Sequence, residues 1–420
     1  IGEWALMICR HCKSKLTHKL VDLGKQPPSN AYLTRDKLNC IENDKCVEKQ
    51  YPLKVLVCDN CFLVQTEDFV GANEMFSKDY AYFSSYSSTW VNHTRSYIDL
   101  VVNRFSLNSS SCIVEIAAND GHLLQHVQNK KIPCYGVEPT ESTALVARSK
   151  GIEIVGEFFG IDNANFIANK HGKADLMVAN NVLAHVPRIN DFVSGFSVVL
   201  KRDGVATFEF PYLLNLIKGR QFDTIYHEHY SYLSFTSVVN ILSMNGLMIF
   251  DIDELSTHGG SLRIYAQRTD TGIRSVSKAV QSMLIKERLA GMNSILFYSK
   301  FQKVVDKIKL EFLEFLINAK RNKLRVAAYS AAAKGNTLIN FLGIKSDLIH
   351  CIADKNIDKQ GKFLPGSHIP IVSEKELEKY NPHYVIIMAW NIKDEIIKQL
   401  KLNQNLHSKF VTVIPEIIVQ

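Results

Sequence analysis

From Cys112 onward the chain alternates between short apolar runs and longer stretches in which apolar residues recur at helical spacing. The runs within residues 112–267 are CIVEIA, CYGVEP, IEIVG, ADLMVAN, GVATFEF, LMIFDID and SLRIYAQ. Helical spacing appears in HLLQHV and TALVARSKG between them. Short apolar strands that alternate with helices are typical of a mostly parallel, doubly wound sheet covered on both faces. The pattern therefore predicts a Rossmann-like α/β core.

The same alternation returns on a smaller scale after Arg325. Strands are expected at VAAYS, LIHCIAD, IPIVS and YVIIMAW, and helices at TLINFLG and EKELEKY. These predict a second, smaller Rossmann-like domain over residues 324–420. Residues 273–323 instead carry helical periodicity and many lysines, which predicts two helices joining the domains.

The N-terminal region is marked by its cysteines, six of which lie within the first 61 residues. Two CxxC motifs, Cys9–Cys12 and Cys58–Cys61, match the spacing of a tetrahedral zinc site. Buried free thiols or a dithiol redox pair are the alternatives. Because sulfur fills all four positions, the zinc is expected to be structural. We therefore expect a zinc-binding module over residues 7–75 and the core over residues 76–272. Met7 is the expected native start.

Composition narrows the class of protein. The 420 residues are 46% hydrophobic and carry a formal net charge of +7, which excludes disordered and fibrous chains. A mild, dispersed positive charge suits an acidic small substrate and does not by itself indicate a nucleic-acid or membrane surface. The sequence has no membrane-length apolar run and no signal-peptide pattern at its start, so a soluble, cytoplasmic protein is expected.

A candidate nucleotide site follows the first strand of the core, which ends at Glu115. The next strand ends at Glu138, where an acidic side chain meets a ribose diol in related folds. Geometry alone allows S-adenosylmethionine, a dinucleotide or a turn with no ligand. Asn180 and Asn181 end the fourth strand. They could contact a ligand or cap the following helix. The turn after Glu115 contains Ala117, Asn119, Asp120 and Gly121.

Proton-active side chains gather at Tyr226-His227-Glu228-His229-Tyr230. His is the side chain most easily poised near neutral pH, and a neighbouring Glu or Tyr can fix its tautomer. General acid or base chemistry is the favoured interpretation, with a metal site or a structural network as alternatives. His185, after the fourth strand, could join this cluster or be a satisfied residue at a domain seam.

Two further turns could hold anionic groups. The first is His258-Gly259-Gly260-Ser261 followed by Arg263, which offers backbone amides and a cation for a phosphate or carboxylate. The second joins Tyr329 to a helix through small residues, Ala333 and Lys334, so that a phosphate could approach the helix N-terminus. Ordinary α/β packing would also explain the alanines of the second turn.

Taken in order, the motifs resemble those of the sugar C-methyltransferase family, S-adenosylmethionine-dependent enzymes that methylate nucleotide-linked 4-keto deoxysugars, often at C-3. The resemblance covers nearly the whole chain. It rests on the paired CxxC motifs, FSKDYAYFSSYS, EIAANDG, GVEPT, NNVLAHV, YHEHYSY, HGGSLR and YSAAAKGN. The family's first turn commonly has serine where Ala118 stands, which is expected to matter little.

The resemblance implies a role for each matching residue. The turn from Glu115 to Gly121, with Glu138 and Asn180, would hold the methyl donor. His229 would be the general base, with Tyr226 the next candidate. The remaining sugar-pocket residues would be Tyr80, His185 and Glu228, and those facing the nucleotide or its diphosphate would be Ser84, Ser85, Asn181, Tyr329, Ala333 and Lys334.

The expected reaction follows from carbonyl chemistry. A carbon beside a ketone is nucleophilic only as its enolate, so a base must take the C–H proton before the methyl is displaced in line. The methyl is expected to arrive on the face of the sugar carbon opposite the departing proton, which predicts inversion of configuration at that carbon. Expected partners are S-adenosylmethionine, structural Zn²⁺ and a 4-keto sugar linked to dTDP or a similar nucleotide, without nucleic acid or membrane. The alternatives are a zinc-ribbon nucleic-acid protein, disfavoured by a nearly neutral module, and a nicotinamide oxidoreductase, disfavoured by the missing glycines.

Overall fold

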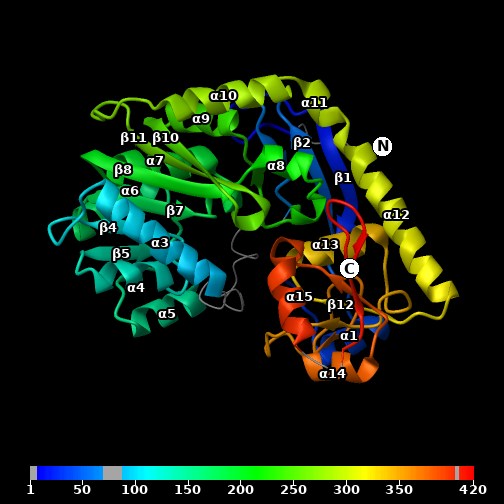
Figure 1. Cartoon of the computed structure of the whole chain (residues 1–420). Helices are drawn as coiled ribbons and strands as arrows, with labels where there is room; N and C mark the ends of the chain where they lie inside the picture. The colour runs from blue at the N-terminus through cyan, green and yellow to red at the C-terminus, as the bar shows by residue number, and fades with distance from the viewer. Residues whose placement is uncertain (1–6, 70–87, 403–405) are drawn as a thin grey trace.

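The computed structural model describes residues 7–69, 88–402 and 406–420, and it confirms the predicted α/β class (Figure 1). The core is a seven-stranded sheet in the order β10-β11-β8-β7-β4-β5-β6. Strands β4 to β8 are parallel, whereas β11 and β10 continue the sheet in antiparallel pairing. Their bounds are β4 Ile113–Ile116, β5 Cys134–Val137, β6 Ile154–Val155, β7 Ala174–Asn180, β8 Leu200–Pro211, β10 Leu247–Leu255 and β11 Ser261–Arg268.

Apolar side chains cover this sheet on both faces, as expected for a doubly wound fold. One core cluster joins the sheet to α3 (Ser88–Arg104), α4 (His122–Asn129) and α5 (Glu141–Ser149). A larger cluster joins the other face to α6 (Ile161–His171), α7 (Ile189–Val199) and α9 (Phe235–Met244). From β4 the chain adds β5 and β6 on one side and then returns to add β7 and β8 on the other side, so the strand order reverses at β4. Ligands of open α/β sheets bind at such a switch point, beyond the strands' carboxyl ends.

The N-terminal module is an antiparallel sheet in the order β1-β2-β3-β9. Its first three strands are β1 (His18–Gln26), β2 (Tyr51–Val57) and β3 (Val64–Thr66). The fourth, β9 (Ser231–Tyr232), comes from the core and pairs Tyr232 with Val64. The module is therefore completed by the segment that follows the predicted acid–base cluster.

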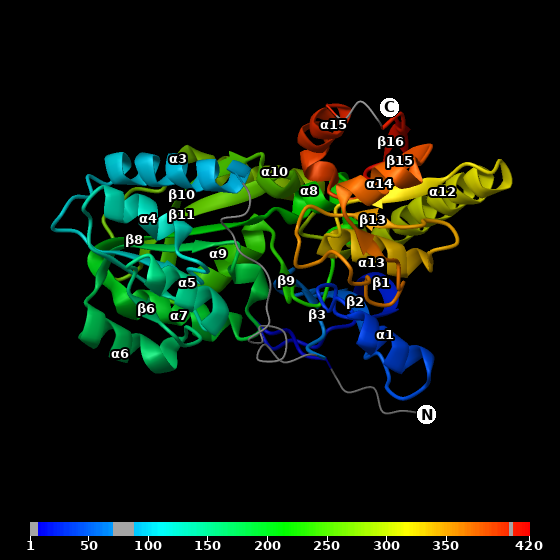
Figure 2. The ribbon, with the colours of Figure 1, turned by 90° about the horizontal axis from the view of Figure 1, so that it is seen from below.

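Helices α10 (Lys278–Ala290) and α12 (Phe301–Arg321) fill the expected connection, with short α11 (Ile295–Ser299) between them. In Figure 1, α10 runs along the top of the core, and α12 runs down the right-hand edge beside the C-terminal domain. Figure 2 shows that domain beside α1 (Arg35–Glu42) and β1 of the N-terminal module. No helix among the described residues is long and apolar enough to span a bilayer.

The C-terminal sheet has the order β14-β13-β12-β15-β16-β17 and is parallel except for β17. The alternating strands and helices predicted after Arg325 are all present. Their bounds are β12 Val326–Tyr329, α13 Ala333–Leu342, β13 Ile352–Ala353, β14 Ile371–Val372, α14 Glu374–Tyr380, β15 Tyr384–Ile387, α15 Lys393–Lys401, β16 Lys409–Thr412 and β17 Ile418–Val419.

A buried carboxylate ties the connecting helices to the core. Glu287 of α10 accepts hydrogen bonds at 2.6 Å from the backbone N–H of Phe235 and at 2.8 Å from that of Thr236. These amides begin α9 and would otherwise lack intrahelical partners. The interaction thus caps one helix with the side chain of another.

Replacing Glu287 with Ala should lower the free energy of unfolding by about 1–3 kcal/mol, because it leaves buried amides without an acceptor. Glu287→Gln keeps one acceptor oxygen and should lose less. The measurement is the urea midpoint of each variant, with Leu289→Ala, at an exposed position of the same helix, as the neighbouring control. Equal midpoints for the Ala and Gln variants would remove the capping role.

Candidate active site

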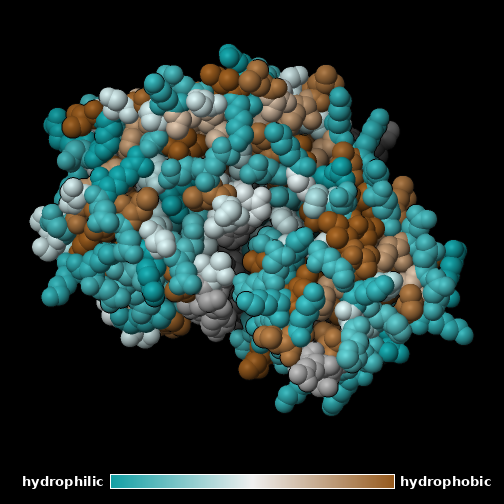
Figure 3. All heavy atoms as spheres, viewed as in Figure 1, coloured by the Kyte–Doolittle hydropathy of each residue, from teal (hydrophilic) through white to brown (hydrophobic). Residues whose placement is uncertain are grey.

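A cavity of 980 Å³ lies where the three parts of the chain meet. Asn30 of the N-terminal module, the carboxyl edge of the core sheet, and Ala333, Lys334 and Lys359 of the C-terminal domain all line it. In Figure 3 hydrophilic residues predominate on the surface, and a hollow separates the core from the C-terminal domain. Most of the predicted methyl-donor and sugar residues share one cavity with residues of the C-terminal turn, namely Glu115, Ala117, Asn119, Glu138, Asn180, His185, Tyr226, Glu228 and His229.

The turn after β4 is tight and has a left-handed backbone. Ala117, Asn119 and Gly121 have φ angles of 57°, 49° and 75°. A Cβ at Gly121 would lie 2.4 Å from Cδ1 of Ile152 and 3.0 Å from Cβ of Ala147. Only glycine fits this close packing against the helix that follows β5. The turn therefore brings the Asn119 amide to the sheet edge beside the cavity.

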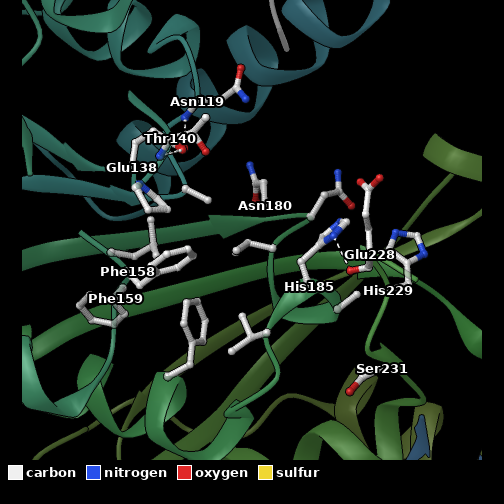
Figure 4. A pocket seen from close by; sticks show the side chains of 18 of the residues that line it. Asn119, Glu138, Thr140, Phe158, Phe159, Asn180, His185, Glu228, His229 and Ser231 are labelled. Carbon is white, nitrogen blue, oxygen red and sulfur yellow. Dashed lines mark hydrogen bonds between the residues drawn. The ribbon is translucent and has the colours of Figure 1, made fainter. Parts of the chain in front are cut away.

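Glu138 lies at the predicted ribose position beyond β5 and lines the cavity. Its carboxylate accepts hydrogen bonds at 2.9 Å from the Asn119 amide and 2.8 Å from the Thr140 amide (Figure 4). Burial raises the pKa of Glu138 and, together with the carboxylates of Asp120 and Glu138, raises that of Glu115 well above its usual range. This acidic end of the cavity suits a cationic ligand, because a bound cation would favour the ionised forms of Glu115 and Glu138 that burial disfavours.

Several buried polar atoms at the acidic end have no protein partner among the described residues. They are Oε2 of Glu115 and both side-chain heteroatoms of Asn180. Since buried polar groups are normally hydrogen-bonded, this set fits a polar ligand. Asn181, next in sequence, also lines the cavity, and its Oδ1 atom likewise lacks a partner in the described structure.

Asp120 and Gly121 are not among the lining residues. The Asp120 carboxylate lies 3.3 Å from Nζ of Lys150 and 3.4 Å from Nδ1 of His122. The Asp120 side chain therefore contacts Lys150 and His122, whereas Asn119 and Glu138 line the cavity.

Aromatic residues that the sequence analysis did not single out also line this end. Phe158 and Phe159 follow β6, and Trp90 projects from α3 (Figure 4 labels the two phenylalanines). The signal was the sequence GEFFG directly after a predicted parallel strand, because parallel strands end at the same sheet edge. Trp90 had no comparable local signal, since its position depends on where α3 packs.

His229 and Tyr226 form a hydrogen-bonded pair in the cavity. Nδ1 of His229 lies 3.0 Å from the carbonyl oxygen of Thr224, and Nε2 lies 3.0 Å from the Tyr226 hydroxyl. A carbonyl only accepts, so Nδ1 carries the proton and donates. In the neutral ring Nε2 then accepts from the Tyr226 hydroxyl. Backbone geometry thereby fixes the tautomer that a base acting through Nε2 requires.

His185 and Glu228 stand beside this pair. Nδ1 of His185 donates to the Glu228 carbonyl at 2.9 Å, and the His185 and His229 rings meet edge to face with centroids 4.6 Å apart (Figure 4). Burial lowers the pKa of His185 to about 4, which keeps it neutral near neutral pH. The Glu228 carboxylate accepts a hydrogen bond at 2.6 Å from Asn30 of the N-terminal module.

The two histidines of the HEH motif face different ways. Nε2 of His227 lies 3.2 Å from the Pro52 carbonyl, in the N-terminal module, and His227 does not line the cavity. Within the described ranges, Cys9, Cys12, Cys58 and Cys61 are the one group of three or more metal-binding side chains. The metal alternative for the HEH motif therefore finds no support in the described residues.

The four predicted zinc ligands come together in the N-terminal module. Their sulfur atoms all lie within 4.8 Å of one another, with Cys9 to Cys61 at 3.6 Å and Cys12 to Cys58 at 3.4 Å. Bonds of about 2.3 Å to a tetrahedral zinc place sulfurs about 3.8 Å apart, so the cluster fits the ion. Gln65 donates to the Cys9 sulfur at 3.2 Å, an outer contact typical of such sites.

The first knuckle also reaches the acid–base cluster. Arg10, between two zinc ligands, donates to the Thr66 carbonyl at 2.7 Å. Thr66 in turn donates through its hydroxyl to the His229 carbonyl at 3.0 Å and through its amide to the Tyr230 carbonyl at 3.1 Å. The zinc-binding turn is thus two contacts from His229.

Arg263 and Tyr329 are not among the residues that line the cavity. The Arg263 guanidinium donates to the buried Glu209 carboxylate at 2.6 Å, and the Tyr329 hydroxyl donates to Glu374. Ala333 and Lys334 do line the cavity. Tyr80, Ser84, Ser85 and the side chain of His258 lie outside the described residues.

Family models cover most of the chain. A "Putative zinc binding domain" matches residues 9–76, a "Methyltransferase domain" matches 90–251 and a "C-methyltransferase C-terminal domain" matches 256–415. With the cysteine cluster, the first match confirms the predicted zinc-binding function of the N-terminal region.

Individual proteins give the same result. The chain is 32% identical to C-methyltransferase NovU of Streptomyces niveus, over 97% of this chain and 95% of NovU. Solved structures are more distant. A methyltransferase from Clostridium acetobutylicum is 13% identical, with coverages of 42% and 92% and a TM-score of 0.35. The PH0226 protein of Pyrococcus horikoshii is 12% identical, with coverages of 45% and 95% and a TM-score of 0.36.

The match to NovU extends across the three regions that build the cavity, and the domain matches follow the same order along the sequence. The chain therefore belongs to the C-methyltransferase family and is an S-adenosylmethionine-dependent C-methyltransferase, as its motifs predicted.

Proposed function

We propose that this enzyme methylates C-3 of a nucleoside-diphosphate-linked 4-keto deoxysugar, by attack of an enolate on the donor methyl. The observation that supports this most is the single cavity of 980 Å³, which joins an acidic end, a His–Tyr pair and two lysines. These features would suit a methyl donor at the acidic end, a sugar beside the His–Tyr pair, and a diphosphate at the lysines.

The acidic end would hold S-adenosylmethionine. Glu138 would accept hydrogen bonds from the ribose, Asn180 would bind a polar group of the donor, and Phe158 would offer an apolar surface; all three line the cavity. The sulfonium is cationic, and its charge would favour ionisation of Glu115 and Glu138, which would then attract it. When bound, the donor supplies an electrophilic methyl; the protein's task is to hold that methyl in line with the sugar carbon.

His229 would be the ultimate proton acceptor. Because the Tyr226 hydroxyl already donates to Nε2, a proton leaving C-3 reaches His229 through the Tyr226 oxygen, while the Tyr226 proton moves to Nε2. The Thr224 carbonyl then stabilises the imidazolium through Nδ1–H. A methyl that arrives on the face opposite the departing proton gives inversion at C-3.

The lysines would bind the diphosphate. Lys334 and Lys359 both line the cavity on the C-terminal side, and the ammonium of Lys359 also donates to the Ala331 carbonyl at 3.0 Å. Cations that line a cavity attract and orient phosphates. The lysines come from the C-terminal domain and the acidic residues from the core, so the nucleotide and the methyl donor would be held by different domains.

The substrate class is tested by methyl transfer and by solvent exchange. Thymidine and uridine diphosphate 4-keto-6-deoxysugars are incubated with enzyme and S-adenosylmethionine, and the product is analysed by mass spectrometry and NMR. A parallel sample in D₂O contains S-adenosylhomocysteine instead, and should exchange the C-3 proton without methylation. The matching 4-hydroxy sugars are the control. Methylation of those controls, or no exchange and no methylation with any ketone, would exclude the enolate proposal.

The base assignment is tested with His229→Asn and Tyr226→Phe. Both variants should lose about 10²–10⁴ of kcat, the usual range for general base catalysis. Both should still bind S-adenosylhomocysteine with nearly wild-type affinity by calorimetry. If Tyr226→Phe retained full turnover while His229→Asn did not, the proton would pass directly to Nε2 and the relay would be wrong.

Zinc loss should impair the enzyme through structure. Cys58→Ser should lose bound zinc, lower the thermal midpoint and reduce turnover. Without zinc the turn from Cys9 to Cys12 is no longer held, and its Arg10 supports Thr66 and, through Thr66, the backbone of His229. Cys46→Ser, in the same module but outside the cluster, should retain zinc and activity. Zinc content by elemental analysis is compared with both readouts, and full activity in a zinc-free Cys58→Ser protein would contradict the link.

A further inference from the structure

Trp390 of the C-terminal domain lies in the seam with the core. It begins the short helix η5 (Trp390–Ile392) and packs against the glycine turn that follows β10. Gly259 has a φ angle of 84°, and a Cβ there would lie 2.6 Å from Cη2 of Trp390. Gly259, the first glycine of the HGG sequence, therefore leaves room for the indole ring.

The indole connects a cavity lysine with a buried carboxylate. Its N–H donates to Oδ2 of Asp223 at 2.7 Å. The ammonium of Lys334 lies 4.7 Å from the ring centroid and donates to Asn391 at 2.6 Å. Asp223 is 1% exposed, and its Oδ1 atom has no partner in the described parts of the chain. The contact to Trp390 is thus a main restraint on this carboxylate.

Asp223 belongs to η3 (Phe222–Thr224), the turn that fixes His229. The Thr224 carbonyl accepts the Nδ1–H of His229. On its other side, the Ile225 carbonyl accepts a hydrogen bond at 2.9 Å from the hydroxyl of Thr337 in α13. The C-terminal domain therefore holds the residues before and after Thr224.

We propose that Asp223 and Trp390 are positioning residues, which couple the cation subsite at Lys334 to the orientation of His229. The inference rests on the proposed function, in which Lys334 holds a diphosphate and His229 receives the proton. A nucleotide that binds Lys334 and bridges core and C-terminal domain stabilises the contact between Asp223 and Trp390, and that contact stabilises η3. Because such coupling is reciprocal, loss of the Asp223–Trp390 contact also weakens nucleotide binding.

The kinetic test uses Trp390→Phe, which keeps a ring beneath Lys334 but removes the N–H donor. The expected result is a kcat lowered about 10- to 100-fold, in line with the cost of misplaced catalytic groups, with KM for S-adenosylmethionine unchanged. Asp223→Ala should behave alike, while Asp223→Asn keeps an acceptor for the indole and should recover most of kcat. Glu395→Gln, which weakens the Thr89–Glu395 contact between α3 and α15, is the control and should match wild type.

A second readout does not require turnover. Hydrogen–deuterium exchange of residues 222–229 is measured with and without thymidine or uridine diphosphate. In the wild type a bound nucleotide should slow exchange there; in Trp390→Phe exchange should be faster and respond less. Wild-type kcat and exchange in Trp390→Phe would overturn the coupling, as would a nucleotide that binds without protecting residues 222–229.

The two proposals fail in different ways. If the wild type neither binds a nucleotide nor methylates a ketosugar, the proposed substrate is wrong. The exchange rate of residues 222–229 in the free Trp390→Phe protein then still decides whether the indole restrains η3: faster exchange than in Glu395→Gln supports the restraint, and equal exchange overturns it.

Discussion

The hydrogen bond from Nδ1 of His229 to the Thr224 carbonyl is the constraint around which this enzyme is organised. It selects the tautomer and, with it, the direction of the bond from Tyr226 to Nε2. A backbone carbonyl is a precise partner only if its own segment is held still. Two other parts of the chain hold the surrounding segment: the zinc-binding module, through Thr66 at the His229 carbonyl, and the C-terminal domain, through contacts at Asp223 and Ile225.

Acidic and basic side chains line different parts of the cavity. Carboxyl groups lie at the carboxyl ends of β4 and β5, lysines line the cavity from the C-terminal domain, and His185 lines it in its neutral form. In the proposed function, the carboxyl groups would face the cationic donor and the lysines the anionic nucleotide. The two Rossmann-like units line one cavity, so they would contribute to one site rather than to two independent sites.

Local patterns were sufficient for the α/β class and for much of the cavity. The strands of the core and C-terminal domain appeared as apolar runs, and the lining residues Glu138, Asn180, His229 and Lys334 all follow strand ends or occupy a dense polar motif. The CxxC pairs were informative because metal ligation imposes a spacing.

What the sequence could not provide are contacts between distant segments. Asn30 and Trp90 enter the cavity through domain packing, and no periodicity predicts that. Likewise, β9 is only two residues long and completes a sheet whose other strands lie in another module. Arg263 looked available to an anion because its partner Glu209 comes from a neighbouring strand, 54 positions away in sequence.

The pairing of Val64 with Tyr232 has a consequence for biosynthesis. On the ribosome, β1, β2 and β3 emerge long before the residues that pair with the outer edge of β3. Until the core reaches β9, that strand has unsatisfied backbone groups of the kind that recruit other chains. The thiolate-bound metal can fold the module early, but only the arrival of the core closes its edge, so the nascent enzyme is most open to misassembly between these two events.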